Sequence, residues 1–158
     1  MKRELAVLAA IFCASAYAQN SIGYAYFAPG GITSYGQTTM TLQMGVGGEA
    51  ILGKGIGIGG DVGAFGPREG FVSGVLGVLS PNLSYHFIHG RWQRADPFVI
   101  GGYTMLFRSG VANLTDFGAG VNFWFARRVG LRVEFRDQVY IQSPRAQMWG
   151  LRLGIAFR

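Results

Sequence analysis

The segment that decides the fold is Met148-Trp149-Gly150-Leu151-Arg152-Leu153-Gly154-Ile155-Ala156-Phe157-Arg158, at the carboxyl end of the sequence. Every second residue from Trp149 to Phe157 is bulky and apolar, and the residues between them are glycine, alanine or arginine. Successive side chains of an extended strand point to opposite faces. One face of this segment is therefore apolar and the other is small or polar, which is typical of a strand in a membrane barrel.

About eight such segments follow one another, joined by turns rich in glycine, proline and charge. We predict strands at 21–28, 40–52, 55–65, 71–87, 97–107, 115–126, 129–141 and 148–158. The segment 71–87 is too long for one strand, and its phase is unclear because Val72, Leu76 and Val78 occupy the face that should be polar. Pro81 is expected to mark a bulge or an early end there. The two faces of 97–107 are also hard to distinguish.

The first 18 residues have the pattern of a secretory signal peptide. A short basic start precedes an apolar run over 5–13, and Ala16-Tyr17-Ala18 matches a cleavage site, so we expect the mature chain to span 19–158. Cys13 is the only cysteine and leaves with the signal, which predicts a mature chain without thiol chemistry or disulfides. We expect one domain in the outer membrane of a Gram-negative-type bacterium.

The composition favours strands over helices. Glycine accounts for 26 of 158 residues, about twice the usual share of ~7%. Apolar residues make up 49% of the chain, yet no segment of the mature chain has the 18 consecutive apolar residues of a spanning helix. The net charge of +6 is scattered over turns and strands, which favours anionic lipid head groups rather than nucleic acid as its partner.

An even number of strands places both chain ends on the same side, which we take to be the periplasm. The turns near Lys54, Gly90 and Arg128 are then periplasmic, and Trp92 lies in a basic turn where a lipid head-group contact is expected. Aromatic residues at strand ends predict a periplasmic girdle: Phe87, Phe98, Phe125 and Phe157. The outward loops, at 30–37, 67–70, 108–114 and 142–145, carry three candidates for contacts with lipopolysaccharide: Arg68, Arg108 and Arg145.

Charged residues on the inward faces predict a lumen closed by ion pairs, because an unpaired charge in so narrow a space costs several kcal/mol. The predicted network comprises Glu49, Asp61, Arg132, Glu134, Arg136 and Arg152. A gated small pore is the alternative for the same residues.

The sequence contains no grouping that indicates catalysis, a metal or a cofactor. Ser84 and His86 share one face, and lipid A deacylases of the outer membrane also use a serine and a histidine. In those enzymes the histidine precedes the serine, whereas here it follows at the periplasmic end, away from the lipid A leaflet. His86 is therefore interpreted as a residue of the rim or of a turn.

Three further segments carry a family resemblance: Asp96-Pro97-Phe98-Val99-Ile100-Gly101-Gly102-Tyr103, Phe117-Gly118-Ala119-Gly120-Val121-Asn122-Phe123 and Arg128-Val129-Gly130-Leu131-Arg132-Val133-Glu134-Phe135-Arg136. With the signal peptide and the final aromatic residue, they make the chain similar to the OmpA/OmpX-like outer-membrane proteins. The resemblance implies an all-β, eight-stranded antiparallel up-and-down transmembrane β-barrel. It also implies a monomer that reaches the membrane with periplasmic chaperones and the barrel-assembly machinery. Arg158 departs from the family pattern, which ends on the aromatic residue itself.

We therefore expect an integral outer-membrane barrel without enzymatic activity, which supports membrane integrity and makes at most weak surface or lipopolysaccharide contacts. One rival is a soluble calycin-like barrel for a small apolar ligand, in which the apolar face would point inward. A lipid A-modifying enzyme and a narrow pore are further alternatives.

Overall fold

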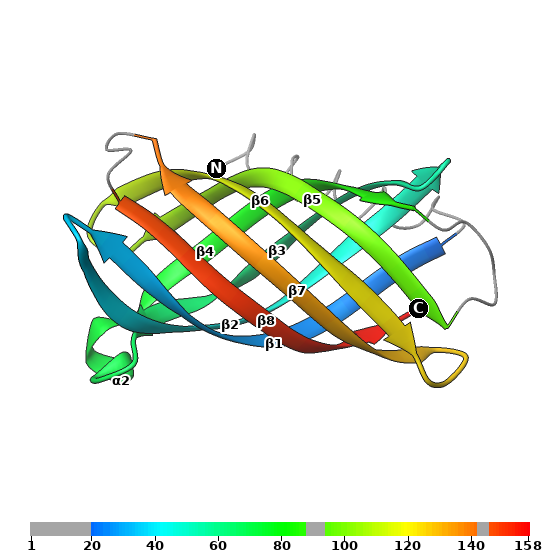
Figure 1. Ribbon diagram of the computed structural model, residues 1–158, viewed down its shortest axis with the longest axis horizontal. Coiled ribbons are helices and arrows are strands. Elements are labelled where there is room, and N and C mark those ends of the chain that lie inside the picture. Colours follow the sequence, from blue (N-terminus) through cyan, green and yellow to red (C-terminus); the bar gives the residue numbers. More distant parts are fainter. Residues whose placement is uncertain (1–19, 88–93, 142–145) are drawn as a thin grey trace, which may run out of the picture.

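The computed structural model describes residues 20–87, 94–141 and 146–158. The predicted signal peptide, Trp92 and Arg145 lie outside these residues. Eight strands form the structure (Figure 1). Their bounds are β1 Asn20–Ser34, β2 Gln37–Gly53, β3 Ile56–Pro67, β4 Leu76–His86, β5 Ala95–Phe107, β6 Val111–Trp124, β7 Val129–Tyr140 and β8 Ala146–Phe157. A short helix, α2 Phe71–Gly74, precedes β4.

Each strand pairs antiparallel with the next one along the chain, and β8 pairs with β1 to close a barrel. This confirms the predicted eight-stranded antiparallel fold. The β1–β8 seam runs from the pair Gly23–Phe157 to the pair Ser34–Ala146, with no pairing at Ala28 and Pro29. Proline lacks the N–H that the ladder requires, which accounts for this interruption. No helix in the described part of the chain is long and apolar enough to cross a membrane.

The first hairpin is longer than predicted. We expected β1 to end near 28 and a loop to span 30–37, but the strand continues to Ser34 and turns at Tyr35 and Gly36. Both turn residues have positive φ, 50° and 79°, as a tight two-residue hairpin turn requires. The alternation of 21–28 is interrupted by Pro29 and two glycines, so it gave no signal that the strand continues.

The segment 71–87 is more than one strand, as its length indicated, but the predicted start of the strand and the predicted role of Pro81 were wrong. Residues 71–74 form a helix and the strand begins only at Leu76, so the long segment contains two elements. Pro81 marks neither a bulge nor an end, because β4 keeps one register with β3 on both sides of the pair Gly60–Pro81. The missing N–H of Pro81 leaves a gap on the β5 side only, between the pairs Leu79–Met105 and Asn82–Gly102.

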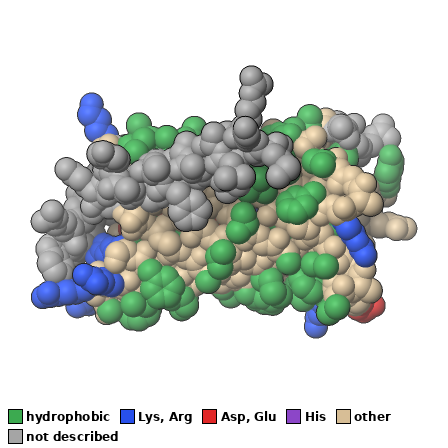
Figure 2. Space-filling model, turned by 180° about the vertical axis from the view of Figure 1, so that it is seen from behind, with side chains coloured by type: hydrophobic (Ala, Val, Ile, Leu, Met, Phe, Trp, Pro, Cys, Tyr) green, Lys and Arg blue, Asp and Glu red, His purple; other side chains and the backbone are tan. Residues whose placement is uncertain are grey.

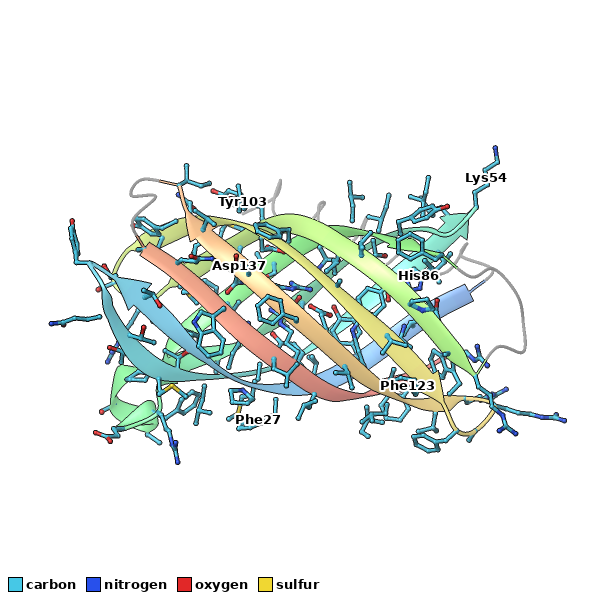
Figure 3. The ribbon with its side chains drawn as sticks, viewed as in Figure 1. Phe27, Lys54, His86, Tyr103, Phe123 and Asp137 are labelled. Atoms are coloured by element: carbon cyan, nitrogen blue, oxygen red, sulfur yellow. The ribbon has the colours of Figure 1, made fainter. Side chains whose placement is uncertain are left out.

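The predicted alternation is confirmed around the barrel. Apolar side chains on the outer wall, such as Val62 and Phe135, are each 50% exposed, whereas the neighbouring Glu134 is 1% exposed. Figure 2 shows apolar side chains along the wall, and Phe27 and Phe123 in Figure 3 belong to this outward set. The inward face carries buried charged residues and the outward face is apolar, the reverse of the arrangement that the soluble-barrel rival requires, so the structure contradicts that rival.

An apolar cluster inside one end of the lumen explains why the phases of β4 and β5 were unclear. Its buried members are Phe65, Val78, Leu106, Leu114 and Met148. Both faces of β4 and β5 carry apolar residues near this end. The inward face therefore cannot be recognised there from a difference in polarity between the two faces. This end lies opposite the start of β1 and the end of β8, at the predicted outward side.

Several glycines allow a neighbouring side chain or backbone to approach the inner wall. A Cβ at Gly47 would lie 2.6 Å from the ring of Tyr24, which is buried in the lumen. We expect Gly47→Ala to lower the free energy of unfolding by about 1–3 kcal/mol, since the ring has to move within a packed interior. Urea unfolding in detergent micelles measures this. Gly101→Ala is the control, because its nearest atom would lie 3.7 Å away. Equal effects of both substitutions would contradict the role of Gly47.

Candidate functional site

The lumen contains a buried network of charges at its centre, built mainly by β7 and β8. Arg132, Glu134 and Arg136 alternate on the inward face of β7, and Arg152 lies directly opposite Glu134 on β8. The β7–β8 register that directs the bulky apolar side chains outward therefore directs these charged side chains into the lumen, where they are neighbours. All four residues are at most 3% exposed.

Glu134 is the centre of this network. Its carboxylate lies 2.9 Å from Arg132 Nη2, 2.6 Å from Arg136 Nη2 and 3.7 Å from Arg152 Nη1. Arg132 also pairs with Glu49 at 3.0 Å. Arg136 and Arg152 pair with Asp61 at 3.2 and 3.1 Å. The structure thus brings together all six residues of the predicted lumen network.

Further lumen residues were not anticipated from the sequence. Asp116 lies 3.6 Å from Arg136 and accepts a hydrogen bond from Thr104. The Tyr26 hydroxyl donates to Asp61 at 2.8 Å. The guanidinium of Arg132 lies between the rings of Tyr24 and Phe98, at 4.3 and 4.1 Å from their centroids. Ion pairing offsets the desolvation of buried charges only when additional hydrogen bonds are present. These partners therefore help to stabilise the network.

A second polar cluster lies between the central network and the end of the barrel where β1 begins and β8 ends, and it includes His86 (Figure 3). The His86 ring lies 2.9 Å from Asp96 through Nδ1 and 3.3 Å from Glu49 through Nε2. The Ser84 hydroxyl donates to Glu49 at 2.6 Å. A nucleophilic serine needs its hydroxyl directed at a base that can take the proton, whereas here a carboxylate that is already paired with Arg132 accepts it. His86 is thus a lumen residue rather than the rim or turn residue we predicted.

The predicted aromatic girdle needs one correction. Phe98 is 1% exposed and lies inside the lumen, where its ring stacks on His86 with centroids 5.4 Å apart. It shares the inward face of β5 with Ile100 and Thr104. The sequence analysis could not tell which face of β5 points inward. Phe87, Phe125 and Phe157 lie exposed at strand ends, on the side of the barrel where β1 begins and β8 ends.

At the end of the lumen where β1 begins and β8 ends, Trp124 points inward and Arg158 covers it. The Arg158 guanidinium lies 4.3 Å from the centroid of the Trp124 ring, and its Nε donates to the carbonyl of Arg127 at 3.1 Å. The backbone N–H of Arg158 also donates to the carbonyl of Arg128. Arg158 thus makes one ring contact and two hydrogen bonds at this end of the barrel.

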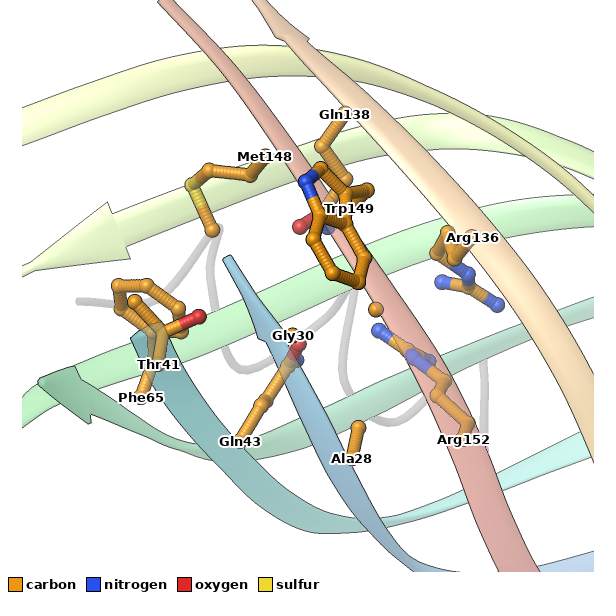
Figure 4. Close-up of a pocket in the computed structure, with 11 residues that line it drawn as sticks. Ala28, Gly30, Thr41, Gln43, Phe65, Arg136, Gln138, Met148, Trp149 and Arg152 are labelled. Carbon is orange, nitrogen blue, oxygen red and sulfur yellow. The ribbon is translucent and has the colours of Figure 1, made fainter. Parts of the chain in front are cut away.

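A small pocket lies in the outward half of the lumen near the β1–β8 seam (Figure 4). Gln43, Gln138, Arg136 and Arg152 line it together with the apolar Phe65 and Met148. Among the described residues, no group of His, Cys, Asp or Glu side chains is placed to hold a metal ion.

The outward arginines lie on exposed loops. Arg68 follows β3, and Arg108 follows β5 and donates from Nη2 to the Ser73 carbonyl of the α2 segment at 2.9 Å. Arg145 lies outside the described residues. The structure therefore places two of the three predicted head-group contacts at one end of the barrel.

A closed barrel with an apolar outer wall and a charged, filled interior is a transmembrane β-barrel. No family model matches the sequence, and no curated protein matches it. Among solved structures, Neisserial surface protein A is similar at a TM-score of 0.69 and 10% identity, over 87% of this chain and 96% of that chain. The N-terminal β-barrel domain of Pseudomonas aeruginosa OprF is similar at a TM-score of 0.65 and 17% identity, over 88% and 97%.

The outer membrane enzyme PagL is also similar, at a TM-score of 0.55 and 16% identity, over 85% of this chain and 99% of that chain. The likeness thus extends to proteins described as a surface protein, a barrel domain and an enzyme. At these identities the comparisons show the fold, which is that of the eight-stranded outer-membrane barrels and is consistent with the OmpA/OmpX-like resemblance.

Proposed function

We propose that the protein is a non-catalytic outer-membrane barrel that supports membrane integrity by spanning the bilayer and closing its own lumen. The observation that carries this proposal is the contrast between the two faces of the wall. Apolar side chains cover the outside, while three arginines and their carboxylate partners fill the centre of the interior. The apolar cluster at one end and Trp124 with Arg158 at the other lie on either side of the charged centre.

The arrangement of Ser84 and His86 supports a non-catalytic assignment. Both side chains bind Glu49, and the cluster lies within the lumen rather than on the lipid-facing wall. A bilayer lipid would have to enter the lumen to reach them. The similarity to PagL therefore supports a shared fold rather than a shared reaction.

The filled lumen predicts that the protein does not conduct ions. We expect planar bilayers that contain the purified protein to show no discrete conductance steps, because buried ion pairs and apolar residues occupy the path. A porin of 16–18 strands, which leaves an aqueous channel, is the positive control in the same lipid. Reproducible steps from the purified barrel would favour the narrow-pore alternative.

The proposed contribution to membrane integrity is tested in cells. Deleting the gene is expected to increase uptake of a hydrophobic dye across the outer membrane, and expression of the intact chain from a plasmid is expected to reverse the increase. Unchanged uptake in the deletion strain would contradict the proposal.

We also propose that Arg68, Arg108 and Arg145 contact lipopolysaccharide phosphates. Cations near an anionic membrane surface contribute roughly 1 kcal/mol each, so the triple alanine variant is expected to retain less lipopolysaccharide during purification. Quantifying lipid A phosphate per barrel measures this. Ser109→Ala, in the same loop as Arg108, is the control. Equal retention in the triple variant and the intact chain would contradict this contact.

A further inference from the structure

Basic side chains surround the barrel at the end where β1 begins and β8 ends. Lys54 lies in the β2–β3 turn, Arg94 precedes β5, and Arg127 and Arg128 lie in the β6–β7 turn. All four are exposed, and we call them the basic rim. Figure 2 shows Lys and Arg side chains at this end, and Figure 3 shows Lys54 extending from it.

The acidic residues of the described chain lie elsewhere. Five of them, Glu49, Asp61, Asp96, Asp116 and Glu134, line the lumen and are engaged there. Glu69 and Asp137 lie toward the opposite end, beyond β3 and in the last part of β7. Within the described residues, Lys54, Arg94 and Arg128 form no ion pair, so their charges are available to an external anion.

The basic rim also lies next to the apolar wall. Exposed aromatic residues stand at the ends of the strands that carry it, with Phe87 after β4, Phe125 after β6 and Phe157 at the end of β8. Aromatic side chains at such a border occupy the boundary between lipid tails and head groups. Long basic side chains beside them reach the head-group phosphates while their stems remain along the apolar surface.

We propose that the basic rim binds the phosphates of anionic phospholipids in the leaflet that surrounds this end of the barrel. The placement of the charges favours a lipid over a protein. The three turns follow one another along the barrel at intervals of two strands, at β2–β3, β4–β5 and β6–β7, so the cations point to different sectors of the circumference. A surrounding leaflet can contact all of these sectors at once, whereas a single protein partner covers one. The inference rests on the proposed membrane-spanning barrel and adds a lipid preference to it.

The test compares lipid binding to the full protein purified in detergent. Phosphatidylglycerol and phosphatidylcholine are titrated separately, and bound lipids are counted by native mass spectrometry. The intact protein is expected to prefer phosphatidylglycerol. Arg94→Gln combined with Arg128→Gln is expected to reduce its affinity for phosphatidylglycerol by about 25-fold, roughly fivefold for each cation removed. The matched control, Arg94→Lys with Arg128→Lys, keeps both positive charges at the same positions and is expected to change the affinity less than twofold.

A retained preference in the glutamine variant, or an equal loss in the control, would overturn the inference. The salt dependence of the intact protein provides a measurement that needs no variant. Because salt screens exposed charges, the preference for phosphatidylglycerol is expected to fall as NaCl is raised from about 0.05 to about 0.5 M. A preference that does not depend on salt would also overturn the inference.

Gel migration with and without boiling is measured on the same samples. A heat-dependent shift without any lipid preference refutes only this inference, whereas the absence of a shift in the intact protein refutes the membrane barrel itself.

Discussion

Replacing Glu134 by glutamine is expected to lower the free energy of unfolding by about 3–5 kcal/mol, the typical effect of removing one partner from a buried ion pair. Glu134 is 1% exposed and lies within 3.7 Å of three arginines. The glutamine keeps the shape of the side chain but removes the charge, so Arg132, Arg136 and Arg152 would share only the remaining carboxylates. Urea titration in micelles, followed by tryptophan fluorescence, measures the loss.

Two comparisons separate this effect from a general effect of charge. Glu69→Gln changes an exposed carboxylate in the outward loop and is expected to shift stability by less than about 0.5 kcal/mol. Combining Glu134→Gln with Arg152→Met removes a positive charge together with the negative one, so it is expected to recover part of the loss. A Glu134→Gln protein as stable as the Glu69→Gln protein would refute the ion-pair network as a stabilising element.

The second large effect is expected at the lipid-facing wall. Leu151 lies near the middle of β8, points outward and is 41% exposed. Arginine at the bilayer midplane of a barrel costs about 2–4 kcal/mol, so Leu151→Arg is expected to lower stability in liposomes by that amount and to reduce the yield of folded protein. The heat-dependent gel shift and urea unfolding in liposomes measure the two effects.

Gln147→Arg is the matched control because it places the same side chain on the same face of β8, close to the end of the strand. Asp137, which accepts a hydrogen bond from Gln147 at 2.6 Å, can also pair with the new charge. We expect a change of about 0–1 kcal/mol near the interface. If Leu151→Arg were tolerated as well as Gln147→Arg, the outer wall would not face lipid, and a water-facing barrel would be the better description.

The fold could be predicted wherever the two faces of a strand differ in polarity. On β7, Leu131, Val133 and Phe135 alternate with three charged residues, and the predicted bounds were close to the observed ones. On β4 and β5 the two faces do not differ in polarity. Val78 and Leu106 point inward into the apolar cluster, and Leu79 and Phe107 on the opposite face are exposed on the outer wall. Proline was also misleading, since Pro81 removes hydrogen bonds to one neighbour without changing the register with the other.

The lumen charges could be anticipated because each lies on a face that is otherwise glycine or polar. The aromatic partners of these charges could not. Tyr24 and Tyr26 lie on a segment with no charge to mark its inward face, and the position of Phe98 depends on the unresolved phase of β5. The cluster of His86 with Glu49 and Asp96 joins β4, β2 and β5, so it depends on the shape of the closed barrel rather than on any local pattern.

The β1–β8 seam has a consequence for the order in which the chain folds. Every other pair of neighbouring strands is joined by a turn or a loop, but the seam joins residues more than a hundred positions apart, such as Gly23 and Phe157. Forming such distant contacts is slow because the entropy of a long loop is lost first. Until the seam forms, β1 and β8 both expose unpaired edges that can capture other chains. Pro29, which interrupts the edge of β1 where its partner is missing, makes that edge a poorer template for aggregation.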